Sequence, residues 1–265
     1  MSEIDLQAIA SRRIVYSLPT AIVRREQAYQ ASDGSMQHLD IYRPAGIEAQ
    51  LPAVISIVGY PDSGMQRVFG RHAKDLGSTV SWAELMAASG LAVVTYVNVN
   101  PIDDAVAVLE HVRKHAPALG IDPRQIGISS YSGNVPNALG LLMGAGRDCI
   151  RRAALLYGYM LDADGSTIVK EMSKFGFVTP ADGKSVDDLP ADTPLFIARA
   201  GLDEMPRLNE TIDAFVARAL ARNLPITVAN HHAGPHAFDA VHDSEETRRI
   251  IRQVVAFLLE GGTGA

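Results

Sequence analysis

Hydrophobic residues follow two repeating patterns along this chain. Short apolar runs rich in β-branched side chains, such as Ala53–Val58 and Leu91–Val97, are typical of strands buried on both faces. Further strands of this kind are predicted at Gln125–Ser130, Ala153–Tyr157, Leu195–Ala200 and Pro225–Ala229. Between and after them, apolar residues at helical spacing predict helices at Ile102–Leu119, Pro136–Gly144, Leu208–Ala221 and Ser244–Leu259. This alternation predicts an α/β fold with a mostly parallel, doubly wound sheet.

The N-terminal part departs from that alternation. Ala21–Tyr29 and Gln37–Arg43 predict two strands around the turn Ser32–Ser35, which form an antiparallel hairpin. Farther along, Ser81-Trp82-Ala83-Glu84 matches a capping box and predicts a helix that begins there and stops at Gly90. We therefore expect an antiparallel hairpin at one edge of the parallel sheet.

The segment Leu161–Asp192 interrupts the series of strands and helices. It is longer than an ordinary connection, rich in Asp, Gly and Lys, and carries Met172, Phe175 and Phe177. We expect a small cap inserted over a pocket, and a surface loop without function is the alternative. Because no linker, repeat or change of composition divides the chain, residues 1–265 are predicted to form one domain, with 161–192 as an insertion.

Composition and charge narrow the classes of partner. The 265 residues are 47% hydrophobic and 20% charged, as in a compact globular enzyme. A formal net charge of -6 and the lack of a Lys/Arg-rich stretch argue against nucleic acid. Charged residues interrupt the first twenty positions, so we expect neither a signal peptide nor a membrane span there, and a cytoplasmic location by default. The single cysteine, Cys149, has no disulfide partner, and the oligomeric state stays open, with a homodimer compatible.

A serine stands where a predicted strand meets a predicted helix. In Ser130-Tyr131-Ser132-Gly133-Asn134, Ser132 directly follows the buried strand and directly precedes the helix. This is the position of a nucleophile elbow, in which a strained turn pushes the serine hydroxyl out of the sheet. A serine that merely caps the helix is the alternative. The setting predicts Ser132 as a nucleophile, with small Ser130 at the first flank and Asn134 where the elbow usually has glycine.

A serine hydroxyl needs a base, and the base needs an orienting carboxylate. Asp203 follows the predicted strand Leu195–Ala200, and His236 lies on a loop after Pro225–Ala229. The C-terminal ends of parallel strands line one crevice, so both side chains can converge on Ser132. Asp162 and Glu204 are alternative carboxylates.

The histidines near His236 allow a second interpretation. His231, His232 and His236 with Asp239 would be a metal-binding set. Gly234-Pro235 interrupts any helix between them, so their spacing does not place them on one helical face. We therefore expect no metal and no cofactor, with His236 as the base.

Acyl transfer also needs hydrogen-bond donors for the developing oxyanion. The backbone N–H of Gly133, directly after the nucleophile, is one expected donor. The second is expected after the strand Ala53–Val58, in Gly59-Tyr60-Pro61, and we predict the N–H of Tyr60 because proline has none. A simple strand-ending turn is the alternative for Tyr60.

The ordered set of elbow, acid and histidine resembles the α/β-hydrolase superfamily from about Ala21 to Leu259. Leu119–Gly127 before the elbow and His236-Ala237-Phe238-Asp239 resemble dienelactone-hydrolase-like and small carboxylesterase members. The resemblance implies an α/β-hydrolase fold with a nucleophile, an acid, a base and two backbone donors, namely Ser132, Asp203, His236, Tyr60 and Gly133. It departs at Val58, where lipase-like esterases have a histidine before further glycines, and at Asn134 in the elbow.

Together these features predict a cofactor-independent serine esterase. Its expected partner is a small-molecule ester, cleaved through an acyl-serine intermediate. Lactone, peptide or acyl-transfer chemistry on the same triad is an alternative, and so is a non-catalytic binding protein on a hydrolase scaffold.

Overall fold

The computed structural model describes residues 6–161, 168–181 and 183–260. Within these residues one eight-stranded sheet has the order β1-β2-β4-β3-β5-β6-β7-β8. The strands are β1 (Ile22–Gln30), β2 (Met36–Pro44), β3 (Leu51–Ser56), β4 (Ala92–Tyr96), β5 (Ile121–Tyr131), β6 (Ile150–Leu156), β7 (Leu195–Ala200) and β8 (Ile226–His231). β1 and β2 pair antiparallel, β2 joins β4 antiparallel, and the other pairs are parallel. The predicted mixed sheet with an N-terminal antiparallel pair is confirmed.

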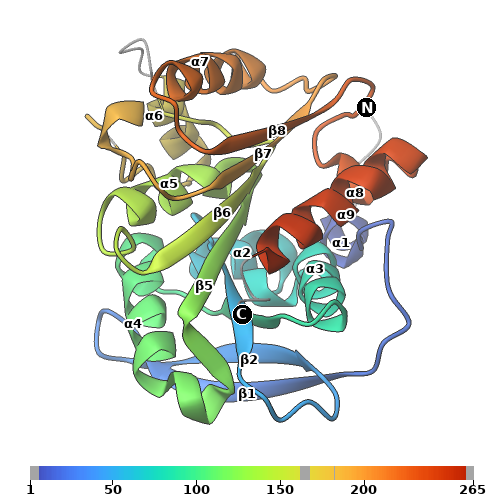
Figure 1. The fold of residues 1–265 in the computed structure, drawn as a ribbon, viewed down its shortest axis with the longest axis vertical. Helices are drawn as coiled ribbons and strands as arrows, with labels where there is room; N and C mark the ends of the chain where they lie inside the picture. The colour runs from blue at the N-terminus through green and yellow to red at the C-terminus, as the bar shows by residue number, and fades with distance from the viewer. Residues whose placement is uncertain (1–5, 162–167, 182, 261–265) are drawn as a thin grey trace.

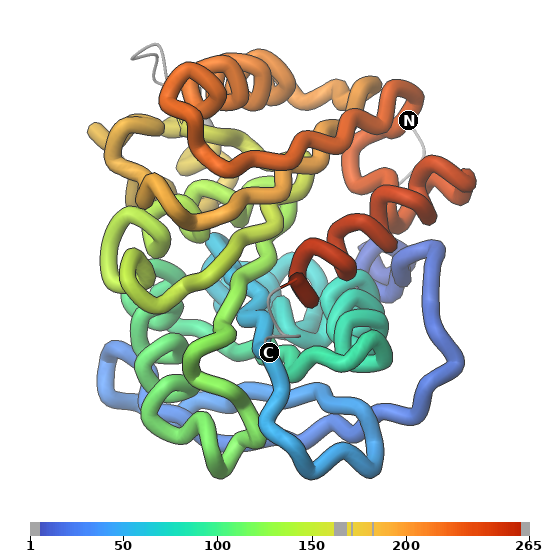
Figure 2. The backbone as a smooth tube through the Cα atoms, viewed as in Figure 1, coloured from blue at the N-terminus to red at the C-terminus, as the bar shows by residue number. Residues whose placement is uncertain are grey.

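Helices cover both faces of the sheet. They are α1 (Leu6–Ser11), α2 (Asp62–Phe69), α3 (Gly77–Ala88), α4 (Pro101–Leu119), α5 (Val135–Met143), α6 (Ile168–Glu171), α7 (Leu208–Ala221), α8 (Phe238–Val241) and α9 (Glu245–Leu259). Figure 1 shows α4 and α5 on one side of β5 and β6, and α3, α8 and α9 on the other. Figure 2 shows the connection from α1 to β1 running down the side of the molecule to the antiparallel edge.

Each face of the sheet therefore has its own hydrophobic core. One core gathers side chains of α4, α5 and α7 against inward residues of the strands, including Val108, Leu139 and Phe215. The other gathers α3 and α9 through residues such as Trp82 and Val254. Successive side chains of a strand enter the two cores alternately. Burial on both faces therefore explains why β3 and β4 are nearly continuous apolar runs.

The predicted start of one helix is wrong. Ser81 was expected to cap the helix before Gly90, but α3 begins a turn earlier at Gly77, and Ser81 is buried inside it. Its hydroxyl donates to the carbonyl of Gly77 at 2.7 Å, and it accepts a hydrogen bond from the N–H of Ile14 at 3.0 Å. A hydroxyl inside a helix can donate to the carbonyl four residues back, as Ser81 does to Gly77. The bond that Ser81 accepts from Ile14 links α3 to the N-terminal segment.

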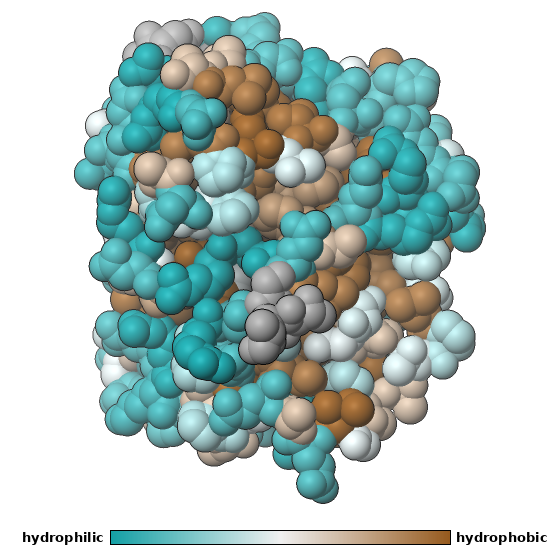
Figure 3. Space-filling view, viewed as in Figure 1, coloured by the Kyte–Doolittle hydropathy of each residue, from teal (hydrophilic) through white to brown (hydrophobic). Residues whose placement is uncertain are grey.

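One edge of the sheet carries an apolar surface. In Figure 3 a hydrophobic area lies where Figure 1 has α7 and the edge strand β8, and the exposed apolar side chains of these elements include Leu220 and Val228. No helix in the described part of the chain is long and apolar enough to cross a membrane. The homodimer that the sequence left open stays a prediction.

Candidate active site

Ser132 lies at the junction of β5 and α5, on a single short turn formed by Ser132–Asn134. Its φ angle is 55°, in the left-handed region that non-glycine residues avoid. Strain of this kind persists only where surrounding structure enforces it, and a nucleophile elbow is such a place. Ser129 and Ser130 before it are fully buried, and the Ser130 hydroxyl donates to the Ile57 carbonyl at 3.1 Å. Of the three serines, only Ser132 presents its hydroxyl to the loops beyond the sheet.

His236 and Asp203, which lie 104 and 71 positions after Ser132 in the chain, form a line of contacts with this serine. The Oγ of Ser132 lies 2.7 Å from Nε2 of His236, and Nδ1 of His236 lies 2.6 Å from Oδ2 of Asp203. Asp203 follows the end of β7, and His236 lies on the loop after β8. The Asp203 side chain is 0% exposed, and its Oδ1 accepts the N–H of Met205 at 2.9 Å. A buried, doubly bonded carboxylate therefore fixes the imidazole that contacts the serine.

The alternative site residues lie elsewhere or have other partners. His231 is buried and bonds Oγ1 of Thr247 at 2.9 Å, and His232 pairs with Glu246 at 2.9 Å. Glu204 is exposed, and Asp162 lies outside the described residues. Among the described residues, no group of three or more His, Cys, Asp or Glu side chains is arranged to hold a metal ion.

A second buried carboxylate, Asp239, lies behind His236. It accepts hydrogen bonds from Trp82 Nε1 at 2.6 Å and from the Tyr157 hydroxyl at 2.7 Å, and burial raises the pKa of its carboxyl group. The Tyr157 ring meets the His236 ring edge-on, with centroids 5.3 Å apart. The Asp239 cluster therefore packs against the His236 imidazole through the Tyr157 ring. In the sequence, only the spacing of Asp239 from His236 hinted at it, because Trp82 is 157 positions away.

Both expected oxyanion donors lie beside the insertion. A Cβ built on Gly133 would lie 2.7 Å from the Phe177 ring, so that ring rests on the Gly133 α-carbon. Phe177 in turn meets the Tyr60 ring edge-on at 5.0 Å. Within the described residues, no protein atom accepts a hydrogen bond from the backbone N–H of Tyr60 or of Gly133. Neither N–H group is therefore taken up by a protein acceptor in the described part of the chain.

Solved structures resemble the fold of this chain over most of its length. Brefeldin A esterase, described as a bacterial homologue of human hormone-sensitive lipase, matches with a TM-score of 0.71 at 18% identity, covering 95% of this chain and 81% of that one. Esterase Est22 matches at 0.68 and 18% identity, covering 91% and 81%. A bacterial heroin esterase matches at 0.66 and 17%, covering 92% and 85%. This chain has the α/β-hydrolase fold.

This chain is similar to those esterases in structure alone. No protein-family model matches its sequence, and no curated protein does. The resemblance to the superfamily that the sequence indicated is confirmed at the level of the fold. The narrower resemblance to dienelactone hydrolases stays a prediction.

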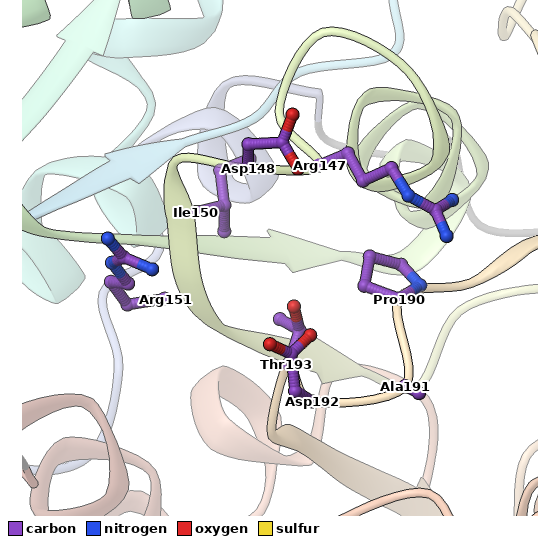
Figure 4. Close-up of a pocket in the computed structure, with 8 residues that line it drawn as sticks. All are labelled: Arg147, Asp148, Ile150, Arg151, Pro190, Ala191, Asp192 and Thr193. Atoms are coloured by element: carbon purple, nitrogen blue, oxygen red, sulfur yellow. The ribbon is translucent and has the colours of Figure 1, made fainter.

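A polar cavity of about 270 Å³ lies away from the serine. Its lining residues, drawn in Figure 4, come from the start of β6 and from the segments just before β6 and β7. Ser132 instead follows the C-terminal end of β5, which is parallel to β6. Arg147 and Arg151 line it, but each guanidinium donates to a backbone carbonyl, of Asp188 and of Arg124 respectively. The cavity takes no part in the arrangement around Ser132.

Proposed function

We propose that this chain hydrolyses carboxylic esters of small molecules through an acyl-serine intermediate. The observation that carries the proposal is the unbroken chain of short contacts from Ser132 through His236 to Asp203, at 2.7 and 2.6 Å. A histidine held this way can take the serine proton and return it to a leaving group. The similarity in fold to three proteins named as esterases supports the same chemistry.

The proposed reaction uses these side chains in two steps. His236 Nε2 accepts the Ser132 proton as Oγ bonds to the ester carbonyl carbon, and the N–H groups of Tyr60 and Gly133 stabilise the oxyanion. The C–O bond to the alcohol then breaks, and the alcohol leaves with the proton from His236. In the second step His236 takes a proton from water as the water oxygen bonds to the acyl carbon. The bond between that carbon and Ser132 Oγ then breaks, His236 returns the proton to Oγ, and the acid is released. Asp203 keeps the Nδ1 proton of His236 in place throughout.

The insertion is proposed to act as a cap over this site. Phe177 touches the Gly133 α-carbon, and the N–H of Val178 donates to the Gly59 carbonyl at 2.8 Å. Pro180 lies against Gly140 of α5. These contacts support the proposal, because they bring the segment around Phe177 against Gly133 and Gly59, where it would bound the substrate. The net charge of -6 suits a small ester better than nucleic acid as substrate.

Replacing the nucleophile tests the proposal. Ser132→Ala should abolish turnover of a short p-nitrophenyl ester, because Ser132 is the only hydroxyl among the described residues that bonds to Nε2 of His236. A fluorophosphonate probe should label the native chain at Ser132 and leave the variant unlabelled. Undiminished hydrolysis by the variant, or labelling at another residue, would reject it. Measuring esters, lactones and amides side by side at equal concentration then separates the reaction classes that one triad can serve.

A further inference from the structure

Nearly all backbone N–H and carbonyl groups of the segment Ile57–Tyr60, between β3 and α2, are hydrogen-bonded to the surrounding protein. The Ile57 N–H donates to Ser129 at 2.8 Å, and the Val58 N–H reaches the Tyr96 hydroxyl at 3.4 Å. The backbone carbonyls in this stretch also accept hydrogen bonds, and that of Ile57 accepts from the Ser130 hydroxyl. Within the described residues, the N–H of Tyr60 alone among its backbone polar groups has no protein partner.

Two asparagines of the elbow and α5 hold the peptide between Val58 and Gly59. The Val58 carbonyl accepts from Asn137 Nδ2 at 2.7 Å, and the Gly59 N–H donates to Asn134 Oδ1 at 2.8 Å. The two groups are the ends of one planar peptide unit, so the two side chains fix its orientation. The backbones are close as well, since a Cβ on Gly59 would lie 3.0 Å from the Asn134 α-carbon.

The next peptide unit carries the free donor. The Gly59 carbonyl accepts the Val178 N–H at 2.8 Å. In a trans peptide the C=O and the N–H point in opposite directions, so this bond directs the Tyr60 N–H away from the cap segment. On its far side the Tyr60 carbonyl accepts Asn98 Nδ2 at 3.2 Å. Three consecutive peptide units around Tyr60 are thereby held.

We propose that Asn134, the residue standing where the elbow usually has glycine, is a positioning residue that orients the Tyr60 N–H toward the oxyanion. The inference rests on the proposed ester hydrolysis. A glycine at 134 would leave the Gly59 N–H without its acceptor, and the Val58–Gly59 peptide would lose one of its two restraints. Donors that are already oriented before the reaction cost no reorganisation when charge develops, which is the source of their effect on rate. The departure from the elbow pattern is thus part of the oxyanion site.

Asn134→Ala tests this, because alanine keeps the Cβ and removes only the acceptor. We expect kcat, counted per active site by fluorophosphonate titration, to fall roughly 10- to 100-fold, less than the loss of a whole donor. KM should change by less than about threefold, since the donor acts on the transition state. The inhibition constant of a trifluoromethyl ketone, which forms a tetrahedral oxyanion on serine, should rise in parallel with the loss of kcat/KM.

The matched control is Asn230→Ala on the edge strand β8. Asn230 is exposed and accepts a bond from Arg199 at 3.1 Å, so the same side-chain change there should leave kcat and the ketone inhibition unaltered. Asn134→Gly provides a second variant if alanine impairs folding. Unchanged kcat per titrated site, or a rise in KM alone, would overturn the positioning role. Retained activity in Ser132→Ala would instead reject the esterase proposal, so the two failures are distinguishable.

Discussion

Replacing Asp203 with asparagine should remove nearly all activity while leaving the shape of the site intact. Asp203 offers one oxygen to His236 at 2.6 Å and the other to the Met205 N–H at 2.9 Å. Asparagine has the same size but only one oxygen, and its NH₂ group can only donate. At one of the two contacts, with His236 or with the Met205 N–H, two hydrogen-bond donors would therefore face each other unless the contact rearranges.

The hydrogen bonds around Asp203 decide which contact changes. If the amide oxygen of the new asparagine turned away from Met205, the backbone N–H of Met205 would face the NH₂ group, another donor. Leaving that N–H without an acceptor would cost about 1–3 kcal/mol of folding free energy. The oxygen is therefore expected to stay on Met205, so that the NH₂ faces His236. His236 then accepts at Nδ1 and carries its proton on Nε2, which points at Ser132. In that tautomer it cannot take the serine proton, and by analogy with the same change in serine proteases kcat should fall roughly 10⁴-fold, or about 5 kcal/mol in activation free energy.

The assay is steady-state hydrolysis of a short p-nitrophenyl ester across neutral pH. The matched control is Asp213→Asn, which alters an exposed carboxylate bonded to Arg199 and should leave kcat unchanged. Circular dichroism and the melting temperature show whether Asp203→Asn stays folded. A folded Asp203→Asn variant with kcat within tenfold of the native chain would refute the reasoning, because the carboxylate would then not set the tautomer of His236.

Two further changes follow from contacts in the structure. Gly133→Ala puts a Cβ 2.7 Å from the Phe177 ring, and it should lower kcat at least about tenfold by displacing the Gly133 N–H. Adding Phe177→Ala should restore part of the activity, and no recovery in this double variant would contradict the contact. Burial lowers the pKa of His231, so the unfolded chain binds that proton more readily below about pH 6.5, and stability should fall as pH drops from there through the folded pKa. His231→Gln should flatten this part of the curve of melting temperature against pH, and an identical curve would exclude the effect.

The periodicity of the sequence was sufficient for the architecture. Strands covered on both faces need apolar side chains at successive positions, and amphipathic helices need them every three or four, so both patterns are visible without tertiary information. The order of Ser132, Asp203 and His236 after three different strands was also visible. Their meeting could be expected because the C-terminal ends of parallel strands share one edge. The start of α3 was misjudged because the sequence Ser-x-x-Glu also fits a serine inside a helix.

Tertiary structure alone decided how the site is held. The bond from Asn134 to the Gly59 N–H joins residues 75 positions apart, and the bond from Trp82 to Asp239 joins residues 157 apart. Side-chain periodicity reports only which face of an element is buried, whereas these contacts depend on how closely two backbones approach. In the sequence, Asn134 was a departure from the elbow pattern. In the folded chain its side chain accepts the hydrogen bond that a glycine there would leave unmade, because Gly59 lies directly against it.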